Sequence, residues 1–334
     1  MRELLITYAF CFAAVCCVHV QPEYTSTILK GHLAGVDAVV FTPDGKILAS
    51  GCMADHSVKL WSVDQGSEIS TFRGHLDDVL SLAISADGKL LASASHDKTI
   101  KLWNLSERRL WTTLYGHSGP VRSLSFSQDG RMLASGSDDK TIKLWETATA
   151  QLRMTLVGHS KEVFGVAFDP DGTQLASASG DSTVKLWSIA TGKERRTLLG
   201  HFKAVYSVAF GRNGILASAG HDKTIKLWSS AHEYKNTIAL NGHTNIVWQV
   251  AFNCEGTILG SCSADGTARL WDVSSGLEQS VLAGHDRSVL SIAFGNGKKF
   301  LATGGFDGDV RLWQNLGGGC NVQAFSATIC RSPK

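Results

Sequence analysis

Short runs in which apolar and polar residues alternate cover most of the chain, and turn signals separate them. In residues 121–126 the alternation is that of a half-buried strand, and Asp129-Gly130 after it is a strong hairpin signal. Further strands are predicted at 132–135, 141–145 and 152–156, with a second turn at 137–139. No window of ten or more residues has the apolar spacing of an amphipathic helix. The pattern therefore predicts a four-stranded antiparallel meander.

This unit is repeated seven times between Lys30 and Trp313. A Gly-His pair recurs every 42 or 43 residues, at His32, His75, His117, His159, His201, His243 and His285. A tryptophan closes each unit, at Trp61, Trp103, Trp145, Trp187, Trp228, Trp271 and Trp313. A single meander cannot bury both of its faces, whereas repeats of this period arranged in a ring bury each sheet against the next. We therefore expect one ring of seven sheets rather than two separate domains.

The recurring Gly-His pair, turn aspartate and closing tryptophan give the chain a family resemblance. It resembles the WD-repeat (β-transducin repeat) family over roughly 285 of its 334 residues. The Trp-Asp pair that names the family is present only at Trp271-Asp272, since Ser, Asn, Glu or Gln follows the other closing tryptophans. The resemblance implies an all-β fold, a monomeric seven-bladed β-propeller of four-stranded antiparallel blades. It also implies that the N-terminal strand, at residues 24–29, closes the last blade.

Three segments are predicted along the chain. Residues 1–21 form a hydrophobic leader, residues 22–316 the propeller, and residues 317–334 a glycine-rich flexible tail. The leader has an uncharged run of signal-peptide length at 4–18 but no clear small-x-small cleavage site, so it is either a secretory signal or a non-targeting extension. The family resemblance implies a cytoplasmic or nuclear protein, whereas a cleaved leader would imply the secretory pathway.

Composition narrows the choice of partners. A net charge of +2 gives no electrostatic footprint for nucleic acid or an anionic membrane. A mean hydropathy of zero indicates that the propeller does not insert into a membrane. Of eight cysteines, three lie in the leader, and Cys320 and Cys330 in the tail are expected to pair only in an exported chain. The other cysteines are expected to be reduced, and no cysteine spacing suggests zinc.

Each repeat also carries a Ser or Thr, an Asp, a His and a Trp at equivalent positions, and Ser, His and Asp together suggest a hydrolase triad. An enzyme needs one such site, whereas this set occurs seven times, so we expect neither catalysis nor a cofactor from it. The family resemblance implies instead a buried hydrogen-bonded relay from Trp to Ser, from Ser to His and from His to Asp, which stiffens each blade. In the second to fourth repeats the relay residues are His75, Ser93, Asp97 and Trp103; His117, Ser135, Asp139 and Trp145; and His159, Ser177, Asp181 and Trp187.

Function is expected where the repeats differ, in loops displayed by a rigid scaffold. The resemblance places the Gly-His loop and the aspartate turn around the mouth of a central channel. At the position after the valine that opens each first strand, three consecutive repeats carry Phe164, Tyr206 and Trp248, which we expect to form an aromatic arc. Exposed aromatic residues ringed by polar groups are typical of interface hot spots. The other candidate partner-binding residues are Ile246 and Phe306 beside the arc, and Asp37, Asp78, Arg122 and Asp138 across the ring.

The sequence thus predicts a non-catalytic scaffold or adaptor that binds a protein or peptide at the channel mouth within a multiprotein complex. An apolar or basic side chain of the partner would suit an aromatic wall opposite carboxylates. Three alternatives stay open: the rings only plug the channel, the propeller is exported and binds a luminal or cell-surface partner, or the mouth is an active site. An active site would need a unique acid/base or metal cluster, and the variable positions offer only scattered Asp, Glu and His. The histidines outside the relay, His56, His96, His221 and His232, are expected to be plain surface residues.

Overall fold

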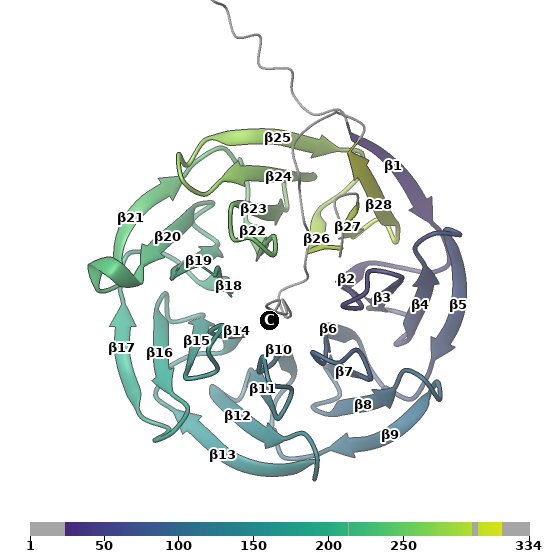
Figure 1. The fold of residues 1–334 in the computed structure, drawn as a ribbon, viewed down its shortest axis with the longest axis horizontal. Helices are drawn as coiled ribbons and strands as arrows, with labels where there is room; N and C mark the ends of the chain where they lie inside the picture. Colours follow the sequence, from purple (N-terminus) through teal and green to yellow (C-terminus); the bar gives the residue numbers. More distant parts are fainter. Residues whose placement is uncertain (1–23, 213, 296–299, 316–334) are drawn as a thin grey trace, which may run out of the picture.

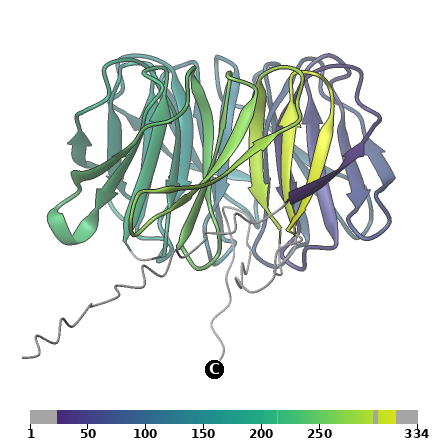
Figure 2. The ribbon, with the colours of Figure 1, turned by 90° about the horizontal axis from the view of Figure 1, so that it is seen from above.

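The computed structural model describes residues 24–212, 214–295 and 300–315. Within these ranges, 28 strands form seven four-stranded antiparallel sheets, which are arranged as blades around a central axis (Figure 1). Seen from the side, the strands run roughly along the channel axis (Figure 2). The all-β, seven-bladed prediction is confirmed. One short 3-10 helix that the sequence pattern did not predict, η1 (Ser230–His232), lies in the fifth blade.

The first four blades follow one another along the chain. Blade 1 consists of β2 (Val36–Phe41), β3 (Ile47–Cys52), β4 (Val58–Ser62) and β5 (Ser67–Phe72). Blade 2 consists of β6 (Val79–Ile84), β7 (Leu90–Ser95), β8 (Ile100–Asn104) and β9 (Arg109–Leu114). Blade 3 consists of β10 (Val121–Phe126), β11 (Met132–Ser137), β12 (Thr141–Glu146) and β13 (Gln151–Val157). Blade 4 consists of β14 (Val163–Phe168), β15 (Gln174–Ser179), β16 (Val184–Ser188) and β17 (Glu194–Leu198).

The remaining blades complete the ring. Blade 5 consists of β18 (Val205–Phe210), β19 (Ile215–Gly220), β20 (Ile225–Ser229) and β21 (Lys235–Leu240). Blade 6 consists of β22 (Val247–Phe252), β23 (Ile258–Ser263), β24 (Thr267–Asp272) and β25 (Glu278–Ala283). Blade 7 consists of β26 (Val289–Phe294), β27 (Phe300–Gly305), β28 (Val310–Asn315) and β1 (Tyr24–Leu29). The predicted closure is confirmed, because β1 from the start of the described chain pairs antiparallel with β28 (Figure 1).

The blades are held together by seven apolar clusters, one at each interface between neighbouring blades. In every cluster the closing tryptophan of one blade packs against the blade before it. Trp103 of blade 2, for example, joins Leu60 and Phe72 of blade 1, and its ring stacks on Phe72 with centroids 4.9 Å apart. Removing such a buried aromatic side chain typically costs about 3–5 kcal/mol of stability. The order of the blades around the ring therefore depends on these contacts.

Polar contacts near the channel also join neighbouring blades. Ser81 of blade 2 accepts the backbone N–H of Leu124 in blade 3 at 3.1 Å, and Ser291 of blade 7 accepts that of Val39 in blade 1 at 2.9 Å. The first strands, β2, β6, β10, β14, β18, β22 and β26, surround the channel (Figure 1). These strands are thus fixed to their neighbours on both sides, and the channel wall is rigid.

Four side chains are connected by hydrogen bonds in every blade, in the order that the family resemblance implies. In blade 3 the Trp145 indole N–H donates to Ser135 at 2.9 Å, and His117 contacts Ser135 at 2.8 Å through Nε2 and Asp139 at 2.7 Å through Nδ1. The serine or threonine of the relay is fully buried in all seven blades, at Ser50, Ser93, Ser135, Ser177, Ser218, Ser261 and Thr303. A substrate therefore has no access to these hydroxyl groups, and the relay belongs to the fold.

The relay carboxylates are ionised over the ordinary pH range. Burial by itself raises the pKa of Asp97, but hydrogen bonds from His75 and Thr99 outweigh it and hold the pKa well below its usual value. A carboxylate whose pKa is lower in the folded state stabilises the fold above about pH 4 and loses this contribution as the pH falls further. Burial lowers the pKa of His159, in agreement with a neutral imidazole that donates through Nδ1 and accepts through Nε2.

Two predicted segments cannot be compared with the structure. The leader at 1–21 and the tail at 317–334, with Cys320 and Cys330, lie outside the described residues. Within the described ranges, no helix has the length and apolar character that crossing a membrane requires.

Replacing Ser135 by alanine tests the structural role of the relay. Ser135→Ala removes the acceptor of the Trp145 indole N–H and the hydroxyl that faces His117, which leaves two buried groups unpaired. We expect the free energy of unfolding to fall by about 1–3 kcal/mol, the cost of unpaired buried polar groups. Urea denaturation followed by tryptophan fluorescence measures it. The control is Ser118→Ala at an exposed position, and equal stability of the two variants would contradict the role assigned to the relay.

Candidate functional site

A β-bulge at the start of each first strand positions the residues at the channel mouth. In all seven blades the pairing between the first and second strands shifts register directly after the opening valine. A bulge leaves one extra residue unpaired and redirects its side chain. The bulged residues are Asp37, Leu80, Arg122, Phe164, Tyr206, Trp248 and Leu290, and all seven line the central cavity.

The cavity is large enough to hold a side chain of a partner. Its volume is about 640 Å³, within the range of roughly 300–1,000 Å³ that is typical of ligand pockets. It extends along the first strands from the bulged residues to Asp169 and Arg212, which follow β14 and β18 at the opposite end of the channel. The channel is therefore a continuous site rather than a shallow surface depression.

Three of the bulged residues form a ladder of aromatic rings in contact. The centroids of Phe164 and Tyr206 are 5.0 Å apart, and those of Tyr206 and Trp248 are 4.9 Å apart. All three side chains are half-buried. Gly165 permits this close approach, because a Cβ atom there would lie 2.9 Å from the carbonyl oxygen of Tyr206. We call Phe164, Tyr206 and Trp248 the aromatic ladder.

The two predicted extensions of the ladder differ in position. Phe306 lines the cavity with 44% of its surface exposed, and the Arg287 guanidinium lies 5.8 Å from its ring centroid. Ile246 is half-buried and does not line the cavity. Two leucines that the sequence analysis did not single out, Leu80 and Leu290, line it through their bulged positions. The bulge that aims them there is not visible in the alternation of the strand.

The polar side of the mouth carries less negative charge than its sequence suggests. Arg122 donates two hydrogen bonds to Asp138, from Nε at 2.8 Å and from Nη2 at 2.6 Å, and this pair compensates the carboxylate. Asp37 lines the cavity, and its burial, together with the nearby charge of Asp78, raises its pKa to about 7. Asp78 and Asp138 themselves do not line the cavity.

A second group of titratable residues lies between blades 1 and 2, away from the cavity lining. Asp78 faces His56, with Oδ1 and Nδ1 3.5 Å apart, and the neighbouring Asp77 faces His96, with Oδ2 and Nδ1 3.3 Å apart. The sequence analysis did not single out Asp77 and expected the two histidines to be plain surface residues. The sequence does contain a signal for this group, namely the adjacent pair Asp77-Asp78 and a histidine in the aspartate turn of each of the first two repeats.

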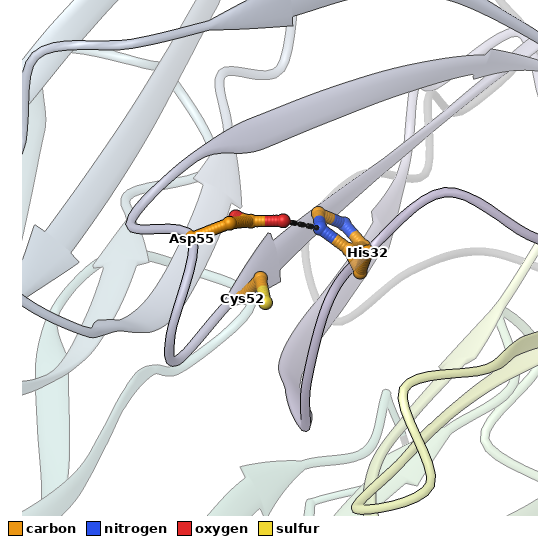
Figure 3. Close-up of side chains that lie close together, drawn as sticks. All are labelled: His32, Cys52 and Asp55. Atoms are coloured by element: carbon orange, nitrogen blue, oxygen red, sulfur yellow. Dashed lines mark hydrogen bonds and ion pairs between the residues drawn. The ribbon is translucent and has the colours of Figure 1, made fainter.

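His32, Cys52 and Asp55 also lie close together in blade 1 (Figure 3). Both nitrogens of His32 are already engaged, Nδ1 with Asp55 at 3.0 Å and Nε2 with Ser50 at 2.7 Å. Cys52 is buried and its thiol donates to the carbonyl oxygen of Ala34, and burial raises its pKa so that it stays protonated. A metal ion here would have to break the relay of blade 1, so we assign this group to the fold.

Comparison with known proteins gives the family. A family model described as WD domain, G-beta repeat matches residues 13–62, 66–104, 108–146, 150–188, 192–229, 234–272 and 276–314. Over 72 residues the chain is 36% identical to a bromodomain and WD repeat-containing protein of Dictyostelium discoideum. This match covers 22% of the chain and only 3% of that protein, so the chain spans a small part of its relative. Because the repeats matched by the family model cover most of the chain and equal the blades in number, the chain belongs to the WD domain, G-beta repeat family.

Proposed function

We propose that the protein is a non-catalytic scaffold that binds a segment of a partner protein at the channel mouth. Propellers of this family are generally scaffolds for protein interactions. The location of the binding site at the channel mouth is proposed from the aromatic ladder, three rings in contact that are half-buried at the edge of an open cavity. Aromatic side chains that are already packed against one another lose little conformational freedom on binding, and they are enriched at interface hot spots.

The charges around the mouth favour an apolar side chain of the partner over a basic one. A lysine or arginine would need free carboxylates opposite the ladder to offset the loss of its hydration. Asp138 is already paired with Arg122, and Asp37 with a pKa of about 7 is partly protonated at neutral pH. An apolar side chain that contacts Phe164, Tyr206, Leu80 and Leu290 meets no such cost.

The space at the mouth supports binding rather than plugging. If the rings served only to fill the channel, they would be packed on all sides by the other bulged residues. Instead they border a cavity of about 640 Å³ and keep part of their surface exposed. Trp248 also packs against the apolar cluster between blades 6 and 7, so its role in stability has to be measured separately.

The cellular compartment is part of the same proposal. We propose that the protein acts in the cytoplasm or nucleus within a multiprotein assembly. Intact mass of the protein purified from cells tests this choice. Cleavage near Cys17, or a glycan on the Asn104-Leu-Ser106 sequon, would instead favour the exported alternative.

Leucine substitutions test the ladder without emptying the mouth. Leu80 and Leu290 occupy equivalent positions in blades 2 and 7, so the combined variant Phe164→Leu, Tyr206→Leu and Trp248→Leu is compatible with the fold. We expect affinity capture from cell extract to lose the partners that the unsubstituted protein retains. For a partner identified in this way, Trp248→Ala alone should weaken binding by more than about 1 kcal/mol, as truncation of a hot spot does.

The matched control removes apolar surface elsewhere. Leu110, Leu152 and Val281 are 40%, 44% and 43% exposed on the fourth strands β9, β13 and β25 and lie outside the cavity lining. Their triple alanine variant should capture the same partners as the unsubstituted protein. If the ladder variant stays folded by thermal denaturation and also captures the same partners, the channel mouth is not the binding site.

The pH dependence of stability tests the buried charge at Asp37. The folded protein holds this proton up to about pH 7, whereas the unfolded chain releases it near 3.8, so stability falls as the pH rises between these values. Asp37→Asn lacks this loss. The free energy of unfolding of Asp37→Asn minus that of the unsubstituted protein should therefore increase by more than about 1 kcal/mol from pH 5 to pH 8.

Urea denaturation at the two pH values measures the gain. Asp37→Leu, with the residue found at Leu80 and Leu290, should show the same pH-dependent gain, because it removes the same titrating group. A constant difference from the unsubstituted protein at both pH values would show that Asp37 is ionised throughout this range.

A further inference from the structure

Two histidines and two aspartates converge between blades 1 and 2. His56 follows the relay aspartate in the turn between β3 and β4, and Asp77 and Asp78 directly precede β6. His96 directly follows β7. The four side chains thus come from three separate loops, and none of them belongs to the hydrogen-bonded relay.

The donor atoms of His56, Asp77 and Asp78 have the separations of a metal site. These atoms lie within 4.8 Å of one another, and His56 Nδ1 is 3.5 Å from Asp78 Oδ1. Around a tetrahedral zinc ion with bonds of about 2.0–2.1 Å, neighbouring donor atoms are roughly 3.3–3.4 Å apart. The three side chains therefore need only a small adjustment to coordinate one ion.

His56 Nδ1 faces Asp78 Oδ1 at 3.5 Å, but it forms no hydrogen bond within the described part of the chain. The atom itself is shielded from solvent, although 38% of the His56 side chain is exposed. A shielded nitrogen without a partner costs free energy, and a metal ion that accepts its lone pair would remove that cost.

Within the described ranges, Asp78 and Asp77 face the histidines His56 and His96 but no permanently charged base. No lysine or arginine of the described ranges makes an ion pair with Asp77 or Asp78, and the nearby Arg122 is engaged with Asp138. A divalent cation would compensate both charges.

His96 is arranged to hold one ligand in place rather than to coordinate. Asp77 Oδ2 is 3.3 Å from His96 Nδ1, and Asp77 Oδ1 accepts the backbone N–H of Asp78 at 2.9 Å. Both oxygens are thus oriented by a neighbour, as the carboxylate ligands of metal ions commonly are.

The group is specific to one blade interface, in contrast to the relay. The position of His56 holds Lys98, Lys140, Ser182, Lys223, Gly266 and Gly308 in the other repeats, and that of Asp78 holds Gly35, Pro120, Glu162, Ala204, Ile246 and Ser288. The propeller does not require these residues for its architecture, because the other six repeats form the same blade without them.

We propose that His56, Asp77 and Asp78 bind a zinc ion, with His96 as a positioning residue for Asp77. One imidazole nitrogen and two carboxylate oxygens suit zinc rather than magnesium or calcium, which prefer oxygen donors alone. Three protein ligands leave one coordination position for water or for a donor from a bound partner. The site is separate from the aromatic ladder, so it does not depend on the function proposed above.

Calorimetric titration of the full chain with zinc chloride, after metal removal with EDTA, tests the proposal. We expect one zinc site in the unsubstituted protein that magnesium does not occupy. His56→Lys and Asp78→Ala should abolish it, and both place residues that other repeats already carry, Lys98 and Ala204. The lysines at the His56 position have φ near 70°, close to the 51° of His56, so the backbone accepts the change.

The positioning role of His96 has its own readout. His96→Ala, with the alanine found at Ala54 and Ala264, should keep the site but raise its Kd roughly 10–100-fold, as the loss of an outer partner does. The matched control is His221→Ala, the equivalent position in blade 5, which should leave the Kd unchanged. Absence of zinc binding by the unsubstituted protein, or an unchanged Kd in His56→Lys, would overturn the proposal, the latter by assigning the zinc to other residues such as the cysteines.

Discussion

The packing of each closing tryptophan against the preceding blade is the contact on which the ring depends. A four-stranded meander has two apolar faces, and neither is covered within the blade. Trp103 covers part of blade 1, and Trp61 of blade 1 covers part of blade 7, including Leu29 of β1. No blade is therefore complete without its neighbours, and the antiparallel pairing of β1 with β28 joins the last blade to the first. The relay fixes each indole through its N–H, so that the ring plane meets the preceding blade in one orientation.

The same rigidity explains where the chain can vary. The core positions and the relay recur in every blade because they make the same contacts seven times. The bulged residue is free to vary, because it is not paired with a residue of the second strand of its blade. Its side chain points into the channel. Seven such positions accept residues as different as Asp37, Leu80, Arg122 and Trp248 without a change in blade geometry. Function can change at these positions at little cost to the fold.

The sequence predicted the features that arise from the period and missed those that arise from contacts between blades. The seven units, the strand at 24–29 and the relay follow from residues that recur at a fixed spacing, so one copy informs all the others. The ion pair of Arg122 with Asp138 connects β10 to the turn after β11, and the raised pKa of Asp37 depends on burial that no pattern reveals. His56 and Asp78 belong to different repeats, and only the ring brings them within 3.5 Å. The aromatic ladder was visible as three residues in register, but the contact of its rings depends on Gly165, whose role is evident only when blade 5 is in place.

The distribution of chemistry around the mouth has a consequence for recognition. A socket with seven equivalent sectors would accept a ligand in seven equivalent rotations, and none of them would be selected by the backbone. Here the aromatic ladder occupies blades 4 to 6, and the carboxylates and histidines occupy blades 1 and 2, on the other side of the channel. If a partner binds as proposed, one with an apolar side chain and a separate metal-binding or polar group can satisfy both regions in one rotation only. The repeated scaffold supplies rigidity, and the departures from its symmetry at the bulges and turns would fix the direction in which a partner bound as proposed is held.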